Sequence, residues 1–143
     1  MLSRLFGLGK KAASSDGSDA RLDRQTPIIV DLARTFLSAV HEMEPHFSRA
    51  FFRYDRGPSD HCVKASIQTG EGVDIVDVLA HKPLFAAMGP LGTALFQAQG
   101  RESGVFLLIV SSPADYEILF DFDSRERWQI SKMGGGTGLP EGL

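Results

Sequence analysis

The spacing of apolar and polar residues predicts two helices separated by strands. The first helical pattern opens at Thr26, a favourable N-cap residue before a proline, and its apolar residues then recur every three or four positions. Pro45 ends this helix, because a proline disfavours helical backbone in the residue before it. A weaker helical pattern covers residues 81–100 and is interrupted at Gly89-Pro90. That interruption predicts a kink or two short helices.

Short runs rich in Val, Ile, Phe and Tyr predict the strands. The predicted strands are residues 48–55, 61–69, 73–79, 105–110 and 116–123, although the third could be an extended approach to the second helix. Residues 105–110 are apolar without a break, which is typical of a strand buried on both faces. Residues 116–123 alternate instead, with one aromatic and aliphatic side and one mostly acidic side. The sequence of residues 127–133 predicts either a last short strand or a segment that docks on the domain.

This order of elements, α-β-β-(β)-α-β-β, predicts an α+β fold. In it, two helices pack on one face of an antiparallel sheet of about four to five strands. We expect a flexible basic-apolar segment and linker over residues 1–25, a single domain over 26–133, and a flexible glycine-rich tail over 134–143. Residues 1–11 could form an interfacial helix, but their glycines and short length favour a disordered or loosely docked tail over contact with a membrane.

Length, net charge and cysteine content limit the kind of partner and the cellular compartment that the sequence predicts. A length of 143 residues fits one domain, and a net charge of −3 argues against nucleic acid as the partner. The single cysteine, Cys62, excludes an intramolecular disulfide framework and fits a reducing compartment. We find no secretory signal pattern and no apolar run of membrane-spanning length, so the sequence predicts a cytoplasmic protein.

Candidate catalytic and metal-binding motifs are weak. His61 and Cys62 are neighbours in a predicted strand, so their side chains point to opposite faces and cannot act together as base and nucleophile. The four histidines lack a metal-binding spacing, and the glycine run at 134–138 lacks the lysine and following helix of a phosphate-binding loop. The sequence therefore predicts a protein that is not an enzyme and that needs no cofactor or metal.

The order of three strand motifs resembles a bacterial family. An aromatic-rich strand, AFFRYD, precedes an apolar strand, VFLLIV, and a closing strand, EILFDFD. Over residues 27–123 this pattern resembles the YezG-like immunity proteins of polymorphic-toxin and contact-dependent inhibition systems. The resemblance implies a small cytoplasmic protein that neutralises a cognate toxin domain by direct binding, without chemistry.

Carboxylates on the closing strand are the predicted partner-binding residues. A rigid acidic face would complement the basic substrate cleft of a nuclease toxin and raise the association rate. The candidates are Glu117, Asp121 and Asp123, with Asp74 and Asp77 as further candidates. The competing interpretation is that these residues are simply the solvated side of an antiparallel sheet.

A second class of binding protein also fits. Small acidic secretion chaperones and adaptors use an α+β sandwich to bind a segment of an effector protein, usually as dimers. That alternative predicts exposed apolar grooves, whereas the immunity hypothesis predicts binding to a folded domain. The sequence leaves the oligomeric state open.

Overall fold

The computed structural model describes residues 16–143, with side chains from residue 22 onward. Two helices and five strands follow one another, with a short 3-10 turn near the end. They are α1 (Asp16–Met43), β1 (Arg49–Arg56), β2 (His61–Thr69), β3 (Gly72–Ile75), α2 (Lys82–Gln99), β4 (Gly104–Ser111), β5 (Asp115–Asp121) and η1 (Met133–Gly135). This is the predicted element order.

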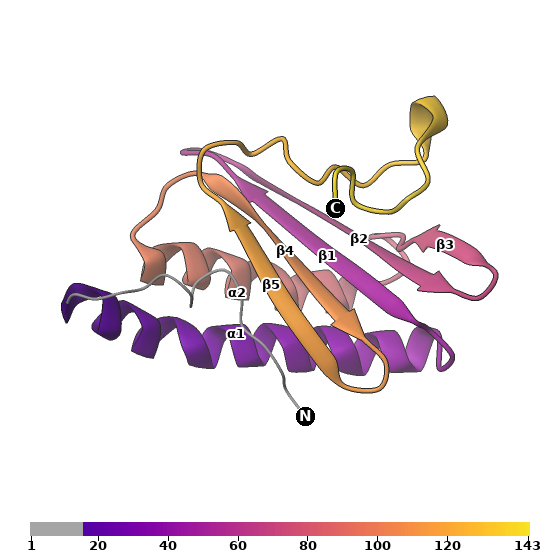
Figure 1. Ribbon diagram of the computed structural model, residues 1–143, viewed down its shortest axis with the longest axis horizontal. Coiled ribbons are helices and arrows are strands. Elements are labelled where there is room, and N and C mark those ends of the chain that lie inside the picture. The colour runs from indigo at the N-terminus through magenta and orange to yellow at the C-terminus, as the bar shows by residue number, and fades with distance from the viewer. Residues whose placement is uncertain (1–15) are drawn as a thin grey trace.

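The five strands form one antiparallel sheet in the order β3-β2-β1-β4-β5. Both helices lie under one face of it, while the C-terminal segment, residues 122–143, runs over part of the other face (Figure 1). The predicted α+β fold is confirmed. Strand β4 is buried on both faces as its unbroken apolar run predicts, but β1 occupies the middle of the sheet.

The larger core lies between the helices and the sheet and is built from aromatic rings. The Phe52 ring, on β1, lies 5.7 Å from that of Phe36 on α1 and 6.2 Å from that of Phe106 on β4, measured between centroids. Gly92 of α2 is required here, because a Cβ at that position would lie 2.5 Å from the Tyr54 ring. Its absence lets the helix backbone approach the sheet closely.

Helix α1 begins at Asp16 and runs through Pro27, so the prediction of a linker is wrong for residues 16–25. Thr26 is therefore a helix-interior residue rather than an N-cap, and its hydroxyl donates to the carbonyl of Leu22 at 2.9 Å. Gln25 is buried against Gln99 of α2, whose amide donates to it at 3.4 Å. Packing against the second helix stabilises a stretch whose local composition favours a loop. The N-terminal part of that predicted linker, residues 1–15, lies outside the described residues.

Two other predicted boundaries change. Helix α2 is one element that includes Pro90, so the alternative of two short helices is wrong. Pro90 is on the exposed side of α2, where water can satisfy the carbonyl that loses its helical donor. Strand β3 ends at Ile75, and the apolar residues after it form a turn rather than the remainder of a strand.

The C-terminal segment closes a second, smaller core. Trp128 and Ile130 are buried against Phe51, Leu107 and neighbouring residues of the sheet face opposite the helices. Residues 127–133 are thus a docking segment and not a last short strand. The composition predicts a flexible tail over residues 134–143, whereas the structure gives them a defined course. The amide of Gly138 donates to the carbonyl of Ser131 at 3.0 Å, and that of Glu141 to Gln129 at 2.9 Å.

Candidate functional site

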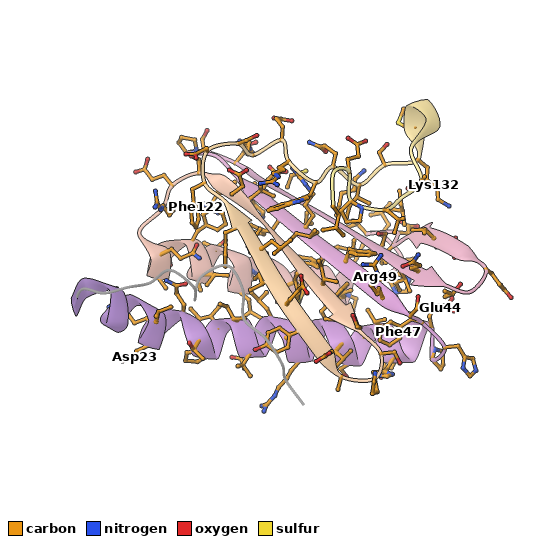
Figure 2. The ribbon with its side chains drawn as sticks, in the orientation of Figure 1. Asp23, Glu44, Phe47, Arg49, Phe122 and Lys132 are labelled. Carbon is orange, nitrogen blue, oxygen red and sulfur yellow. The ribbon has the colours of Figure 1, made fainter. Side chains whose placement is uncertain are left out.

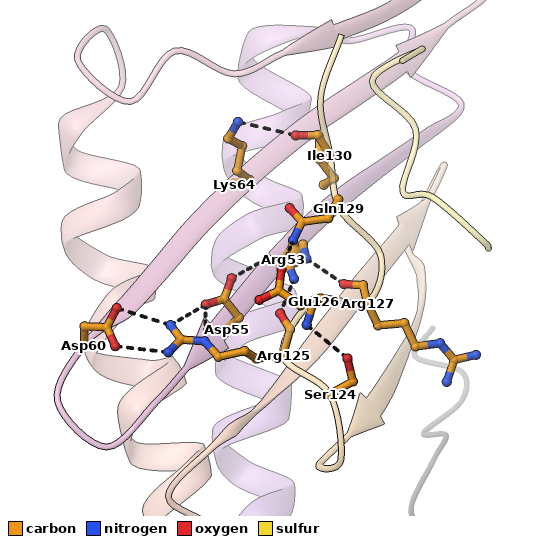
Figure 3. A network of polar contacts seen from close by, with 10 residues as sticks. All are labelled: Arg53, Asp55, Asp60, Lys64, Ser124, Arg125, Glu126, Arg127, Gln129 and Ile130. Carbon is orange, nitrogen blue, oxygen red and sulfur yellow. Dashed lines mark hydrogen bonds and ion pairs between the residues drawn. The ribbon is translucent and has the colours of Figure 1, made fainter. Parts of the chain in front are cut away.

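A buried arginine on β1 attaches the C-terminal segment to the sheet (Figure 3). Arg53 is 3% exposed, and its Nε donates to the carbonyl of Arg127 at 2.8 Å while Nη2 donates to that of Arg125 at 2.6 Å. Its Nη1 forms an ion pair with Asp55, two residues along the same strand and therefore on the same face. Each of the three guanidinium nitrogens thus donates to the segment or to its own strand.

A second arginine, Arg125 of the C-terminal segment, completes the network. The Arg125 guanidinium donates to Asp55 Oδ1 from Nη2 at 2.7 Å and to Asp60 Oδ1 from Nη1 at 3.0 Å. The hydrogen bond from Arg125 lowers the pKa of Asp60, and the two carboxylates raise that of Arg125. Because the charges are satisfied within the chain, this network is a structural clamp rather than a free binding site.

The three carboxylates predicted on the closing strand lie near β5, at one edge of the sheet. Glu117 is half-buried, and Asp123 is exposed just beyond the end of β5. Asp121 is committed to local structure: its Oδ1 accepts the amide of Asp123 at 2.9 Å, and its Oδ2 pairs with Arg127 at 3.1 Å. The hydrogen bond from the Asp123 amide is the main cause that lowers the pKa of Asp121.

The two further acidic candidates lie at the other edge of the sheet. Asp74 is on β3, and Asp77 follows it in a turn, whereas β5 is at the opposite end of the strand order. The structure therefore does not bring Asp74 and Asp77 together with the carboxylates of β5 in one array. The Asp74 side chain is 83% exposed, and one carboxylate oxygen lies 4.0 Å from Nζ of Lys132.

Two adjoining hollows open where the end of α1, strand β3 and the start of α2 meet. One, of about 400 Å³, lies between α1 and the start of α2, and the other, of about 320 Å³, lies between the end of α1 and β3. Met43 and His81 line both, so the two hollows are neighbours. We call the two hollows together the Met43 groove. Its apolar lining consists mainly of Ala39, Met43, Ile67, Ile75, Val76 and Leu84.

A tight turn projects two large apolar side chains beside this groove. Val78 is 42% exposed and Leu79 is 76% exposed, and the residues on either side of them, Asp77 and Ala80, line the groove. The amide of Leu79 donates to Asp77 Oδ1 at 3.0 Å, and that of His81 to the carbonyl of Asp77 at 3.1 Å. These hydrogen bonds fix the turn, so the exposure of Leu79 follows from a defined backbone.

The lining of the Met43 groove is acidic. Four carboxylates contribute to it, namely Glu42, Glu44, Asp74 and Asp77. Glu44 lies at the end of the molecule where α1 leads to β1, while Lys132 reaches toward the β3 side from the C-terminal segment (Figure 2). An apolar floor with an acidic rim can bind a segment that carries large apolar side chains next to lysine or arginine.

Sequence reasoning missed this groove because it assigned residues 73–79 to a strand. In a strand, Val78 and Leu79 would point to opposite faces and neither would be conspicuous. The signal that was present is the pair of aspartates at 74 and 77 in the run VDIVDVL. Aspartate competes with strand pairing by bonding to nearby amides, as Asp77 does here.

The catalytic candidates remain separate. The His61 ring stacks on Tyr54 at a centroid distance of 5.4 Å, on the helix side of the sheet, whereas Cys62 is exposed and paired in register with Asp55 on the other side. Within residues 16–143, no group of three or more His, Cys, Asp or Glu side chains is placed to hold a metal ion. No helix in this described part of the chain is long and apolar enough to cross a membrane.

Comparison with protein-family models and with curated protein sequences finds no match to this chain. The resemblance to YezG-like immunity proteins therefore stays a hypothesis, carried by the strand motifs alone.

Proposed function

We propose that this chain is a protein-binding module that takes a segment of another polypeptide into the Met43 groove. The observation that carries the proposal is the exposure of Leu79 and Val78 beside an apolar depression. Exposing large aliphatic side chains next to one another is unfavourable in water, and such patches commonly mark protein interfaces. This function corresponds to the adaptor or secretion-chaperone alternative.

Leu79 has the features of an anchor residue. It is held by a turn that the Asp77 side chain and backbone stabilise, so little conformational entropy is lost when a partner covers it. The apolar floor lies beside it, and the acidic rim would remain solvated around a bound segment.

The test places a photo-crosslinking amino acid at position 79 of the full chain in the cells that express it. A control chain carries the crosslinker at Glu102, an exposed residue in the loop after α2, at the far end of that helix. We expect position 79 to capture a polypeptide that position 102 does not. In the purified pair, Leu79→Asp should then weaken binding roughly tenfold or more, as loss of an anchor residue does. Identical products from both positions, or unchanged affinity of Leu79→Asp, would contradict the proposal.

Neutralisation of a toxin domain is the second candidate function, and the accessible carboxylates Glu117 and Asp123 near the β5 edge favour it. Reversal of charge at Asp121 is a poor test, because this side chain also holds the turn after β5. The double variant Glu117→Lys/Asp123→Lys leaves that turn intact. We expect it to lose protection of cells against a co-expressed toxin encoded beside it, with Asp31→Lys, exposed on α1, as the control. Full protection by the double variant would exclude the acidic-face mechanism.

A further inference from the structure

One segment of the chain has the chemistry that the Met43 groove would recognise. Residues 1–11, MLSRLFGLGKK, contain Arg4, Lys10 and Lys11 and no acidic residue. They also contain large apolar side chains, namely Leu2, Leu5, Phe6 and Leu8. The groove offers the complement, an apolar floor with carboxylates around it. Opposite charges around an apolar contact favour one pairing over others and give it its orientation.

The length of α1 limits how much of the segment can reach the groove of its own chain. The helix begins at Asp16, and its groove-lining residues run from Thr35 to Met43. At a rise of 1.5 Å per residue, these positions lie about 28 Å and about 40 Å from the start of the helix. Residues 12–15 span at most about 14 Å when fully extended. Lys10 and Lys11, at most about 22 Å from Asp16 even in an extended chain, therefore cannot reach Glu42 of their own chain, which lies about 39 Å from the start of the helix, whereas the groove of another copy can receive the whole segment.

We propose that residues 1–11 of one copy bind the Met43 groove of a second copy. The inference rests on the proposed function, since the groove must first accept a polypeptide. It names the polypeptide that occupies the groove. Reciprocal exchange of two such segments makes a closed dimer, in which each chain gives one segment and receives one. A partner polypeptide must then displace the segment, so self-association regulates access to the groove.

The test measures the self-association of the full chain by sedimentation velocity over a range of concentrations. One variant reverses the segment, Arg4→Glu/Lys10→Glu/Lys11→Glu, and another reverses the groove, Glu42→Lys/Glu44→Lys/Asp74→Lys. We expect the unmodified chain to form a dimer and each variant to raise the dissociation constant roughly tenfold or more, because attractions become repulsions. Mixing the two variants should restore both segment–groove contacts, because the acidic segment meets the basic groove and the unchanged segment meets the unchanged groove. Combining all six substitutions in one chain should restore self-association of that chain.

Asp77 is left unchanged in these variants because it holds the turn that presents Leu79. The matched control reverses three exposed carboxylates away from the groove, Asp23→Lys/Glu102→Lys/Glu141→Lys. This control should leave the dissociation constant of the dimer unchanged. Circular dichroism spectra that match the unmodified chain show that each variant is folded.

A crosslinker at position 79 identifies the occupant. In a mixture of isotope-labelled and unlabelled chains, we expect crosslinks between position 79 of one copy and residues 1–11 of the other. A chain that stays monomeric at every concentration overturns the inference, and so does a dimer that both charge reversals leave intact. If position 79 captures only a different polypeptide, the self-association fails while the proposed function stands. If it captures none, both fail.

Discussion

The two faces of the sheet are covered in different ways. The face toward α1 and α2 carries a continuous apolar core with interlocking aromatic rings, among them Phe36, Phe52 and Phe106. The opposite face is partly covered by the C-terminal segment, which contributes Trp128, Ile130 and Leu139 to the apolar contacts and is attached through the buried Arg53.

This difference separates two sources of stability. Burial of aromatic side chains is non-directional and grows with the area removed from water. A buried guanidinium is favourable only while each of its hydrogen bonds is made, since an unpaired buried charge costs several kcal/mol. We therefore expect the helix-covered face to set global stability and the clamp to set whether the C-terminal segment stays in place.

The largest effect should follow from Phe52→Ala on the helix-covered face. Phe52 is fully buried and contacts rings from both helices and β4. We expect the free energy of unfolding to fall by about 3–5 kcal/mol, the range for Phe-to-Ala changes in packed cores. Urea unfolding followed by circular dichroism measures it. Phe122→Ala, at a half-buried ring near the sheet edge, is the control and should cost less. Equal losses would remove the contrast between core and periphery.

Arg53→Met should be the next largest change. It removes the donors to the carbonyls of Arg125 and Arg127, and we expect about 3 kcal/mol of destabilisation for breaking a buried charge network. Trp128 is the single tryptophan, so its fluorescence reports the C-terminal segment directly. If the Trp128 emission of Arg53→Met shifts to the red at a lower urea concentration than the one that unfolds the helices, the two faces are distinct in stability. Arg101→Met, which loses a cation at 4.5 Å from the Phe122 ring, is the control and should cost about 0.5–1 kcal/mol. Coincident fluorescence and circular dichroism transitions would make the two faces one cooperative unit.

A smaller, local effect concerns residues 134–143, for which composition predicts flexibility. The amides of Gly138 and Glu141 are hydrogen-bonded, and we expect them to exchange with deuterium slower than the amide of Gly142 by a factor on the order of ten. Hydrogen exchange measured by NMR resolves these sites. In Arg53→Met the difference should disappear. Equal rates in the unmodified chain would support the flexible tail.

The smallest effect is the pH dependence contributed by Asp121. Its pKa is lowered in the folded chain, first by the Asp123 amide, so its contribution to stability is complete above the unfolded pKa of about 4. That contribution is lost as pH falls through the lower folded pKa. Asp121→Asn keeps an oxygen for the turn but cannot ionise, so its stability, measured between pH 6 and pH 2, should fall less steeply than that of the unmodified chain. Asp31→Asn, on exposed α1, serves as the control, and an unchanged slope for Asp121→Asn would exclude this contribution.

Local sequence patterns were sufficient to locate strands β2 and β4. The strands predicted at residues 61–69 and 105–110 match β2 and β4 within a residue at each end. The start of α1 was not accessible to such reasoning, because residues 16–25 are polar and Gln25 is buried only against Gln99 on a helix far along the chain. The residues of the Met43 groove were equally inaccessible, since they come from α1, β2, β3 and α2.

The sequence by itself thus determined the α+β class, the element order and the faces that each strand buries, because periodicity records which side chains leave water. Only the tertiary structure decided which charges are free. Arg53 and Asp55 pair within one strand, but Arg125 lies 70 residues further along the chain than Asp55, and no local pattern encodes their ion pair. It also placed Asp74 and Asp77 beside the Met43 groove and away from β5, because strand order places residues that are distant in sequence side by side.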